Sequence, residues 1–375
     1  MLFKFVPRHY DKQHVDVKQT SGGETALARQ LFRATALSGT RGVAAKMLAR
    51  RVPKILGQRM ASPNDLPVLV TGANGFLGRA LVAELAARGR AVKAATRTGG
   101  AAATAVGPIE SATDWRAALR DVGAVIHCAA RVHVLNDASA DPLAAYREVN
   151  TEGTLNLARQ AADAGVRRLV FVSSIKVNGE ETAPGRPYTA DDAPAPSGGY
   201  GISKLEAEQG LHAIAAATGL EVVIVRPPLV YGPGVKANFA GMMRLLARGV
   251  PLPLGSVTGN RRSLVALDNL VDLLIACTDR PGAAGGTFLV SDGEDLSTAE
   301  LLRRLAAAMD RRAALLPVPV PVLAAGAALV GKREVAKRLL GSLQVDIERT
   351  RARLGWTPPV AVDEALRRAA TGISR

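Results

Sequence analysis

Three side chains suited to proton transfer stand at spacings that a folded chain can bring together. Ser174 ends an apolar run in Phe171-Val-Ser-Ser174, and the stretch Tyr200-Gly-Ile-Ser-Lys204 follows. On a helix, Tyr200 and Lys204 share one face because they are four residues apart. An ammonium group beside a phenol favours the phenolate and lowers the pKa of the phenol. We therefore expect Tyr200 to pass a proton to or from a substrate hydroxyl.

A glycine-rich turn earlier in the chain could hold the phosphates of a dinucleotide. In Pro67-Val-Leu-Val-Thr-Gly-Ala-Asn-Gly-Phe-Leu-Gly78, a short apolar run is followed by glycines at three-residue spacing, and apolar residues then recur at helical period. Such a strand, turn and helix let the backbone approach a pyrophosphate at the positive end of the helix dipole. A bare turn would need the same glycines, but the flanking elements favour cofactor binding by Gly72, Gly75 and Gly78.

The end of the next predicted strand bears on which nicotinamide nucleotide is bound. NAD-selective folds carry Asp or Glu there, about 20 residues past the glycines, on the ribose 2′-hydroxyl. This chain has Thr96-Arg97-Thr98 instead. A guanidinium matches the geometry of a 2′-phosphate, so Arg97 favours NADP(H). A solvated Arg97 would leave NAD(H) open.

Strand and helix patterns alternate from Val68 onward, which predicts an α/β fold with a Rossmann-type, doubly wound parallel sheet. After about residue 291 the strands stop, and a smaller, mainly helical substrate lobe is expected. The predicted strands are 67–71, 91–96, 123–128, 168–173, 221–226 and 286–290. Predicted helices are 76–88, 114–120, 141–163, 199–218, 236–248, 268–279, 297–309, 320–340, 345–354 and 362–371.

The same pattern predicts the domain boundaries. A dinucleotide-binding domain spans 66–233, segment 262–292 returns to it, and residues 234–375 are mainly the substrate-binding lobe. Residues 1–65 form a basic extension with twelve Lys and Arg against four acids, in a chain of net charge +15. That extension could be a disordered tail, a membrane-surface helix or a dispensable leader, and we favour the leader. The remainder is only mildly basic, which fits an anionic substrate and gives no reason to expect nucleic acid.

Two further features bear on location. Cys128 and Cys277 lie in apolar runs and have no metal-site spacing, so we expect buried free thiols, no metal and a cytoplasmic protein. Ala313–Val330 carries no charge over eighteen residues, but three prolines would break a spanning helix. We predict a Pro-rich strap and then a buried helix, with a peripheral membrane contact as the alternative.

Several motifs together resemble the extended short-chain dehydrogenase/reductases, the NAD-dependent epimerase/dehydratase family, over residues 66 to 372. They include the glycine turn, Ser174 and the Tyr200/Lys204 pair. The others are His127-Cys-Ala-Ala130, Val149-Asn-Thr-Glu-Gly-Thr154, Arg226-Pro-Pro-Leu-Val-Tyr-Gly-Pro233 and Leu354-Gly-Trp-Thr-Pro358.

The resemblance implies roles for individual residues. Ser174 would hydrogen-bond the reacting oxygen, Tyr200 would be the acid/base, and Lys204 would hold the ribose. Arg262 would grip a UDP-sugar pyrophosphate, and Asn238 is a weaker substrate candidate. Besides Arg97, Tyr200 and Lys204, the expected cofactor contacts are Gly72, Asn74, Gly75, Phe76, Leu77, Gly78, Ala129, Ala130, Asn150 and Pro227. The family usually has Asp where this chain has Ser263, and a homodimer through helices 141–163 and 199–218 is usual.

The residues after Ser174 limit the reaction. Family dehydratases carry an Asp-Glu pair there and related decarboxylases a Glu, whereas this chain has Ile175 and Lys176. The remaining reactions act at C4 of a UDP-hexose or UDP-N-acetylhexosamine. Arg97 favours a 4-ketoreductase, with a 4-epimerase holding NAD as the alternative. The stretches Arg131-Val-His-Val-Leu-Asn-Asp137 and Ser174-Ile-Lys-Val-Asn-Gly179 resemble a bacterial subgroup of the family commonly labelled as 4-epimerases, and this resemblance implies that such a reductase would act in surface-polysaccharide precursor synthesis. A non-catalytic cofactor sensor is a third hypothesis, although such proteins usually lose the Tyr or the Lys. Glu206 and Glu208 are expected on a solvated helix face.

Overall fold

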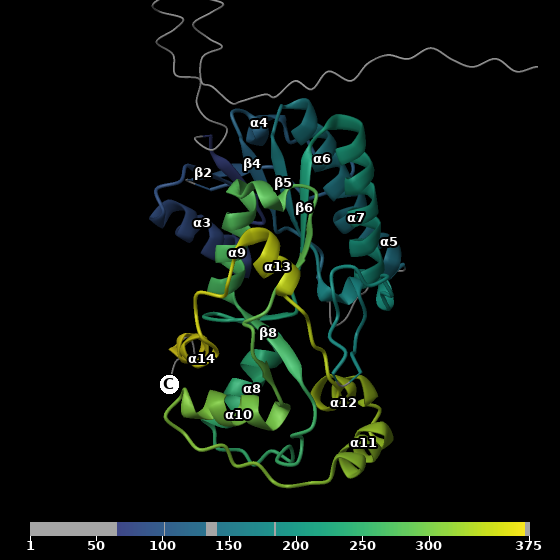
Figure 1. The fold of residues 1–375 in the computed structure, drawn as a ribbon, viewed down its shortest axis with the longest axis vertical. Helices are drawn as coiled ribbons and strands as arrows, with labels where there is room; N and C mark the ends of the chain where they lie inside the picture. Colours follow the sequence, from purple (N-terminus) through teal and green to yellow (C-terminus); the bar gives the residue numbers. More distant parts are fainter. Residues whose placement is uncertain (1–65, 101, 133–140, 184, 372–375) are drawn as a thin grey trace, which may run out of the picture. The chain divides into compact units, whose positions relative to one another are not determined.

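A computed structural model describes residues 66–100, 102–132, 141–183 and 185–371, so the basic extension 1–65 lies outside the described residues. The described chain folds around a parallel sheet of seven strands in the order β3-β2-β1-β4-β5-β6-β9 (Figure 1). These strands are β1 (Val68–Thr71), β2 (Val92–Thr96), β3 (Ala103–Ala105), β4 (Ala124–His127), β5 (Arg168–Val172), β6 (Glu221–Arg226) and β9 (Thr287–Leu289). The predicted doubly wound sheet is confirmed. Its order reverses between β1 and β4, where such folds bind ligands at the carboxyl ends of the strands.

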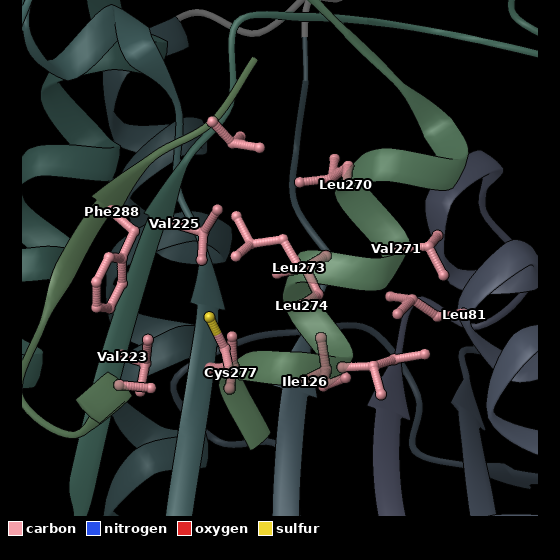
Figure 2. Packing of buried hydrophobic residues seen from close by; sticks show 14 of the residues in the cluster. Leu81, Ile126, Val223, Val225, Leu270, Val271, Leu273, Leu274, Cys277 and Phe288 are labelled. Carbon is pink, nitrogen blue, oxygen red and sulfur yellow. The ribbon is translucent and has the colours of Figure 1, made fainter. Parts of the chain in front are cut away.

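Alternate side chains of the strands are buried on opposite faces of this sheet. Val68 and Val70 join a core cluster with helices α3 (Phe76–Ala87) and α9 (Leu267–Asp279). Leu69 joins the cluster on the other face, with α4 (Arg116–Leu119), α6 (Gly153–Asp163) and α7 (Gly198–Thr218). Figure 2 shows the first cluster, with leucines of α9 packed over the strands. Because both faces are covered, the strands read as continuous apolar runs in the sequence.

A second, smaller sheet forms the centre of the part of the chain that includes α8 (Ala237–Ala247), α10 (Thr298–Ala307) and α14 (Val362–Thr371). Its three strands lie in the order β10-β8-β7, with β7 (Leu229–Tyr231), β8 (Arg262–Ala266) and β10 (Asp295–Leu296). The third core cluster packs β7, β8 and β10 against these three helices. The sequence predicted none of these strands, and the expectation that strands stop near 291 was wrong for β10. Strands β7 and β10, with three and two residues, are too short to show a period of two, whereas β8 has five residues.

Asp292 ties the small sheet to α9. Its carboxylate accepts hydrogen bonds from the Ala266 amide (2.8 Å), the Asn269 side chain (2.7 Å) and the Tyr231 hydroxyl (2.8 Å). Asn269 also exchanges two hydrogen bonds with the Val360 backbone, at 2.9 and 2.8 Å. Since α9 packs on the large sheet as well, these bonds fix the position of the small sheet beside it.

The segment predicted as one buried helix over 320–340 forms two helices, α11 (Val320–Leu329) and α12 (Arg333–Leu340). The break falls at Gly331, which has a φ of 68°. Neither helix contains a buried residue, so the prediction of a buried helix was wrong. The two helices pack mainly against each other. Among the helices in the described ranges, none is long and apolar enough to cross a membrane.

An extended segment follows α12, over residues 341–347, and is called the strap from here on; it is distinct from the Pro-rich segment before α11. The strap joins the loop after β5 to the small sheet. The Ser342 carbonyl accepts a hydrogen bond from the Thr182 amide at 2.9 Å, and the Leu343 carbonyl accepts one from the Ser263 amide at 2.8 Å. Helix α13 (Glu348–Leu354) then packs beside β9. The strap therefore links segments from both sheets.

Leu273 of α9 offers a test of the core. It is fully buried, so Leu273→Ala should lower the free energy of unfolding by about 2–5 kcal/mol through lost burial and the cavity left behind. Urea denaturation measures the change. As a control, Leu329→Ala removes a side chain that is 88% exposed and should change stability by less than about 0.5 kcal/mol. Equal losses for the two variants would contradict the packing of α9.

Candidate active site

The turn after β1 leaves no room for side chains at two of its glycines. Gly72 has a φ of 64°, and a Cβ on it would lie 2.9 Å from the Cα of Ala129. A Cβ on Gly78 would lie 2.2 Å from the carbonyl oxygen of Gly72. The Gly75 amide donates to that same carbonyl at 2.9 Å. The turn is therefore packed tightly between α3 and the loop after β4.

Helix α3 begins directly after this turn. Its N-cap is Gly75, and no side chain caps its first amides. Asn74 and Gly75 are exposed, and Phe76 and Leu77 are partly exposed. Uncapped amides at the positive end of a helix dipole form a site for an anion. These residues therefore fit the pyrophosphate of a dinucleotide.

Arg97 lies at the carboxyl end of β2, the strand that pairs with β1. Its side chain is exposed, while its carbonyl accepts a hydrogen bond from the Gly107 amide at 3.1 Å. The Thr96 hydroxyl accepts another from the Gly99 amide at 3.0 Å. The strand end is thus held by its backbone, and the exposed guanidinium is compatible with either nucleotide.

His127 fixes the loop that carries Ala129 and Ala130. Its ring nitrogens lie 2.7 Å from the Thr71 hydroxyl and 3.0 Å from the Thr154 hydroxyl, which joins β1, β4 and α6. Burial lowers the pKa of His127 to about 3, so the ring is neutral at physiological pH. The His127 side chain is therefore a buried structural link between β1, β4 and α6, next to the loop expected to contact the cofactor.

Asn150 holds the other side of the same loop. It lies in a π-helical segment, η1 (Arg147–Glu152), between α5 (Pro142–Tyr146) and α6. Its side chain accepts a hydrogen bond from the Arg131 amide (2.8 Å) and donates to the Arg131 carbonyl (3.0 Å) and the Ser203 hydroxyl (3.1 Å). Asn150 is fully buried and positions this loop, and its direct contact with a cofactor stays a prediction.

Ser174, Tyr200 and Lys204 meet at the carboxyl end of β5. Ser174 caps a 3₁₀ turn, η2 (Ile175–Val177), and hydrogen-bonds Tyr200. Lys204 is one turn along α7 from Tyr200, and its Nζ donates to the Val172 carbonyl at 2.9 Å. The ring edge of Tyr146 approaches Tyr200, with centroids 6.2 Å apart. The structure thus brings together the three residues predicted to carry the chemistry.

Desolvation controls the charge states of this trio. Burial raises the pKa of Tyr200 to about 12, and the hydrogen bond with Ser174 opposes the shift. The sequence predicted the opposite, a Tyr200 pKa lowered by Lys204. Burial also lowers the pKa of Lys204 to about 8. Since the Lys204 ammonium binds the Val172 carbonyl, desolvation of the phenol outweighs the attraction of that charge, and Tyr200 is a neutral phenol near pH 7.

A buried ion pair between α7 and the end of β6, which the sequence analysis missed, holds α7 in place beside the trio. Glu208 and Arg226 form two side-chain hydrogen bonds, the shorter at 2.6 Å, and both side chains are almost fully buried. Ser173 donates to Glu208 at 2.5 Å, and Arg226 donates to Asn178 at 2.9 Å. The prediction that Glu208 lies on a solvated face was wrong. Its spacing of four residues from Lys204 was the available signal, because it places Glu208 on the same buried face of α7.

Pro227 closes this region on the β6 side. It is buried, and its carbonyl accepts a hydrogen bond from the Ile175 amide at 3.0 Å. The ends of β5 and β6 are therefore held side by side near Ser174, and the contact of Pro227 with a cofactor stays a prediction.

The candidate substrate residues belong to the small-sheet part of the chain. Arg262 begins β8 and donates to the Gly341 carbonyl at 3.1 Å, and burial lowers its pKa. Asn238 lies in the first turn of α8. Ser263, where the family usually has Asp, donates to Asp295 at 2.5 Å and accepts from the Val345 amide at 2.9 Å. The Ser263 hydroxyl thus anchors the strap beside Arg262.

Comparisons with known proteins agree with this geometry. A family model described as "NAD dependent epimerase/dehydratase family" matches residues 68–290. A Vibrio cholerae protein called UDP-glucose 4-epimerase is 50% identical over 308 residues, covering 81% of this chain and 94% of the relative. A solved short-chain dehydrogenase/reductase superfamily protein from Agrobacterium tumefaciens, with bound NAD, is 26% identical with a TM-score of 0.63, covering 82% and 96% of the two chains. UDP-N-acetylglucosamine 4-epimerase from Bacillus cereus shares the fold, with 21% identity, a TM-score of 0.68 and coverage of 82% and 98%.

Gly78→Ala tests the tight turn. The added methyl group would overlap the Gly72 carbonyl, so we expect the free energy of unfolding to fall by about 1–3 kcal/mol and nucleotide binding to weaken. Urea denaturation and a fluorescence titration with NAD measure these effects. A Cβ on Gly241 in α8 meets open space, so the control Gly241→Ala should bind NAD as the unmodified protein does. Unchanged binding by Gly78→Ala would contradict the assignment of the turn.

His127 should make stability depend on pH. Its folded pKa of about 3 lies below the ordinary value of 6.5, so the unfolded chain binds a proton that the folded protein refuses. Stability is therefore complete above pH 6.5 and falls as the pH drops towards 3, by up to about 1.4 kcal/mol per pH unit. His127→Gln should remove this slope between pH 6.5 and 5 in urea denaturation.

The matched control for that experiment is His212→Gln, because His212 is exposed. It should keep the pH slope of the unmodified protein. If His127→Gln kept the slope as well, His127 would not be the neutral buried link described here.

Proposed function

The chain belongs to the NAD-dependent epimerase/dehydratase family, and from that premise we propose that it is a UDP-hexose 4-epimerase. The observation that carries the proposal is the meeting of Ser174, Tyr200 and Lys204 at the carboxyl end of β5, the same edge of the sheet at which the glycine turn follows β1. The relative at 50% identity, named UDP-glucose 4-epimerase, supports the choice of reaction and of a UDP-sugar substrate. This reverses the order of preference drawn from the sequence, in which Arg97 placed the 4-ketoreductase first.

The acid/base chemistry follows from the charge states of the trio. Tyr200 is a neutral phenol near pH 7, so it must first release its proton to solvent before it can act as a base. Its phenolate, strongly basic because of the raised pKa, can then take the proton of the C4 hydroxyl during oxidation and return it when the hydride comes back, so the epimerisation exchanges no net proton. Ser174 can hydrogen-bond the same reacting oxygen, since it already bonds to Tyr200. Lys204 keeps most of its positive charge at pH 7, and this charge favours the phenolate form of Tyr200 during the reaction. When bound, NAD would supply the hydride acceptor for oxidation at C4.

NAD is the nucleotide we propose. The family and the NAD-bound relative from Agrobacterium tumefaciens support this choice. Arg97, exposed at the end of β2, is then a solvated side chain and no partner of a 2′-phosphate. Phe76, Leu77 and the uncapped start of α3 would hold the pyrophosphate, and the loop at Ala129 and Ala130 would lie against it.

The groups after Ser174 are unsuited to elimination of water. Ile175 is buried, and the ammonium of Lys176 is paired with Glu180 at 2.8 Å. No carboxylate stands where the family's dehydratases carry their acid/base pair. This supports a reaction confined to C4.

A cytoplasmic homodimer through the helices at 142–163 and 198–218 is the assembly that we propose for the enzyme.

The direct test is turnover without added nucleotide. UDP-glucose incubated with the purified protein alone should give UDP-galactose, separated and quantified by ion-exchange chromatography. If conversion required added NADPH and a UDP-4-ketosugar, the enzyme would be a 4-ketoreductase and the proposal would be wrong.

Tyr200→Phe tests the assigned acid/base. Loss of the hydroxyl should lower kcat by roughly 10²–10⁴-fold, with little change in nucleotide binding. Tyr146→Phe is the matched control, because it removes a neighbouring hydroxyl and keeps the ring contact with Tyr200. It should retain near-normal turnover. Comparable kcat values for Tyr200→Phe and the unmodified protein would rule out Tyr200 as the proton carrier.

A further inference from the structure

The segment from Ala313 to Gly331, called here the apolar segment, is partly or fully exposed, although Ala313 and Leu315 at its start pack against the third core cluster. It has nineteen residues without a charged side chain and contains α11. No residue of α11 is buried. Leu316, Val322, Leu329 and Val330 are 50%, 58%, 88% and 68% exposed. A helix that is apolar all round is normally covered on every side, and an exposed apolar patch of this kind marks an interaction surface.

Basic residues stand at both ends of the apolar segment. Arg311 and Arg312 precede it, Lys332 and Arg333 follow it, and α12 adds two more. The exposed bases are Arg311, Arg312, Lys332, Arg333, Lys337 and Arg338. Between residues 311 and 338 the only acid is Glu334. The surface therefore combines exposed apolar side chains with a strong positive charge.

We propose that the apolar segment docks the protein onto an anionic membrane surface. Helix α11 would lie in the plane of the interface, with its apolar side chains among the upper acyl chains and the flanking bases on the headgroups. Its ten residues extend for about 15 Å, half the thickness of the hydrocarbon core, so it lies on the membrane and does not cross it.

The charges favour a lipid surface over a second copy of the chain. Two copies joined through α11 would bring two sets of basic flanks together, and like charges in contact oppose association. Such a pair would also cover one side of each helix, whereas the residues around α11 are apolar on all sides. On a membrane, anionic headgroups would neutralise the basic residues. The acyl region would bury every face of α11 that the rest of the protein leaves exposed.

The docked element lies apart from the catalytic edge. Figure 1 shows α11 and α12 at the margin of the small-sheet part, away from the large sheet. After α12 the chain continues into the strap, where the Gly341 carbonyl accepts a hydrogen bond from Arg262. Docking would therefore hold the substrate-binding side near the membrane without covering Ser174 or Tyr200.

Vesicle co-sedimentation of the full chain tests the proposal. The protein should bind vesicles of phosphatidylglycerol and phosphatidylcholine in equal amounts, and bind phosphatidylcholine alone much less. The triple variant Val322→Ser/Leu329→Ser/Val330→Ser should lose at least about tenfold in affinity, since each side chain would otherwise be buried among acyl chains. All three side chains are exposed, so the variant should fold and keep its turnover of UDP-hexose.

The control variant Leu245→Ser/Val250→Ser removes exposed apolar side chains outside the apolar segment and should bind as the unmodified protein does. The proposal is wrong if the unmodified protein does not bind the mixed vesicles. It is also wrong if the triple variant binds them equally well, because the basic residues of 1–65 would then account for binding. A lower oligomeric mass of the triple variant by light scattering would instead make the segment a contact between copies.

Leu329→Trp gives an independent readout. Trp115 and Trp356 are 0% and 2% exposed, so a new indole at position 329 would dominate any change in fluorescence. Mixed vesicles should shift its emission to shorter wavelength as the indole leaves water. Emission that stays at the wavelength of an exposed indole, while the protein sediments with the vesicles, would overturn the proposal.

Discussion

The arrangement of the catalytic edge depends on the buried ion pair between Glu208 and Arg226. Two charges taken out of water are costly unless their remaining hydrogen-bonding groups are satisfied. Here Ser173 donates to the carboxylate and Asn178 accepts from the guanidinium. The four residues come from the end of β5, the turn after it, α7 and the end of β6. The pair therefore fixes the helix that carries Tyr200 and Lys204 against the strand end that carries Ser174.

Buried, hydrogen-bonded side chains also fix the loops near the glycine turn, where the groups are neutral and not an ion pair. His127 bridges Thr71 and Thr154, and Asn150 binds both backbone groups of Arg131. Loops at the edge of a sheet are ordinarily the mobile part of a Rossmann-type fold. Buried side chains that are fully hydrogen-bonded restrain these loops, so the glycine turn, the loop after β4 and the catalytic trio keep one geometry.

Local pattern was enough to predict the trio and the strands of the large sheet except β3, which has only three residues. Val68 to Val70 and Val222 to Val225 are apolar on both faces, which only a covered parallel strand requires, and four-residue spacing places Tyr200 beside Lys204. Burial that depends on partners distant in sequence was not predictable in this way. Glu208 was assigned to solvent because its partner Arg226 follows on another strand, and α11 was assigned to the core because its composition is apolar. Strands β7 and β10 were too short to show a period.

The central claim is that the active site oxidises and reduces the same sugar carbon with one retained nucleotide. Denaturing the purified protein and identifying the nicotinamide nucleotide that it releases tests this most directly. The account predicts NAD or NADH in near-stoichiometric amount. A protein that is purified without nucleotide and binds NADPH far more tightly than NADH would contradict it, and Arg97 would then be the partner of a 2′-phosphate.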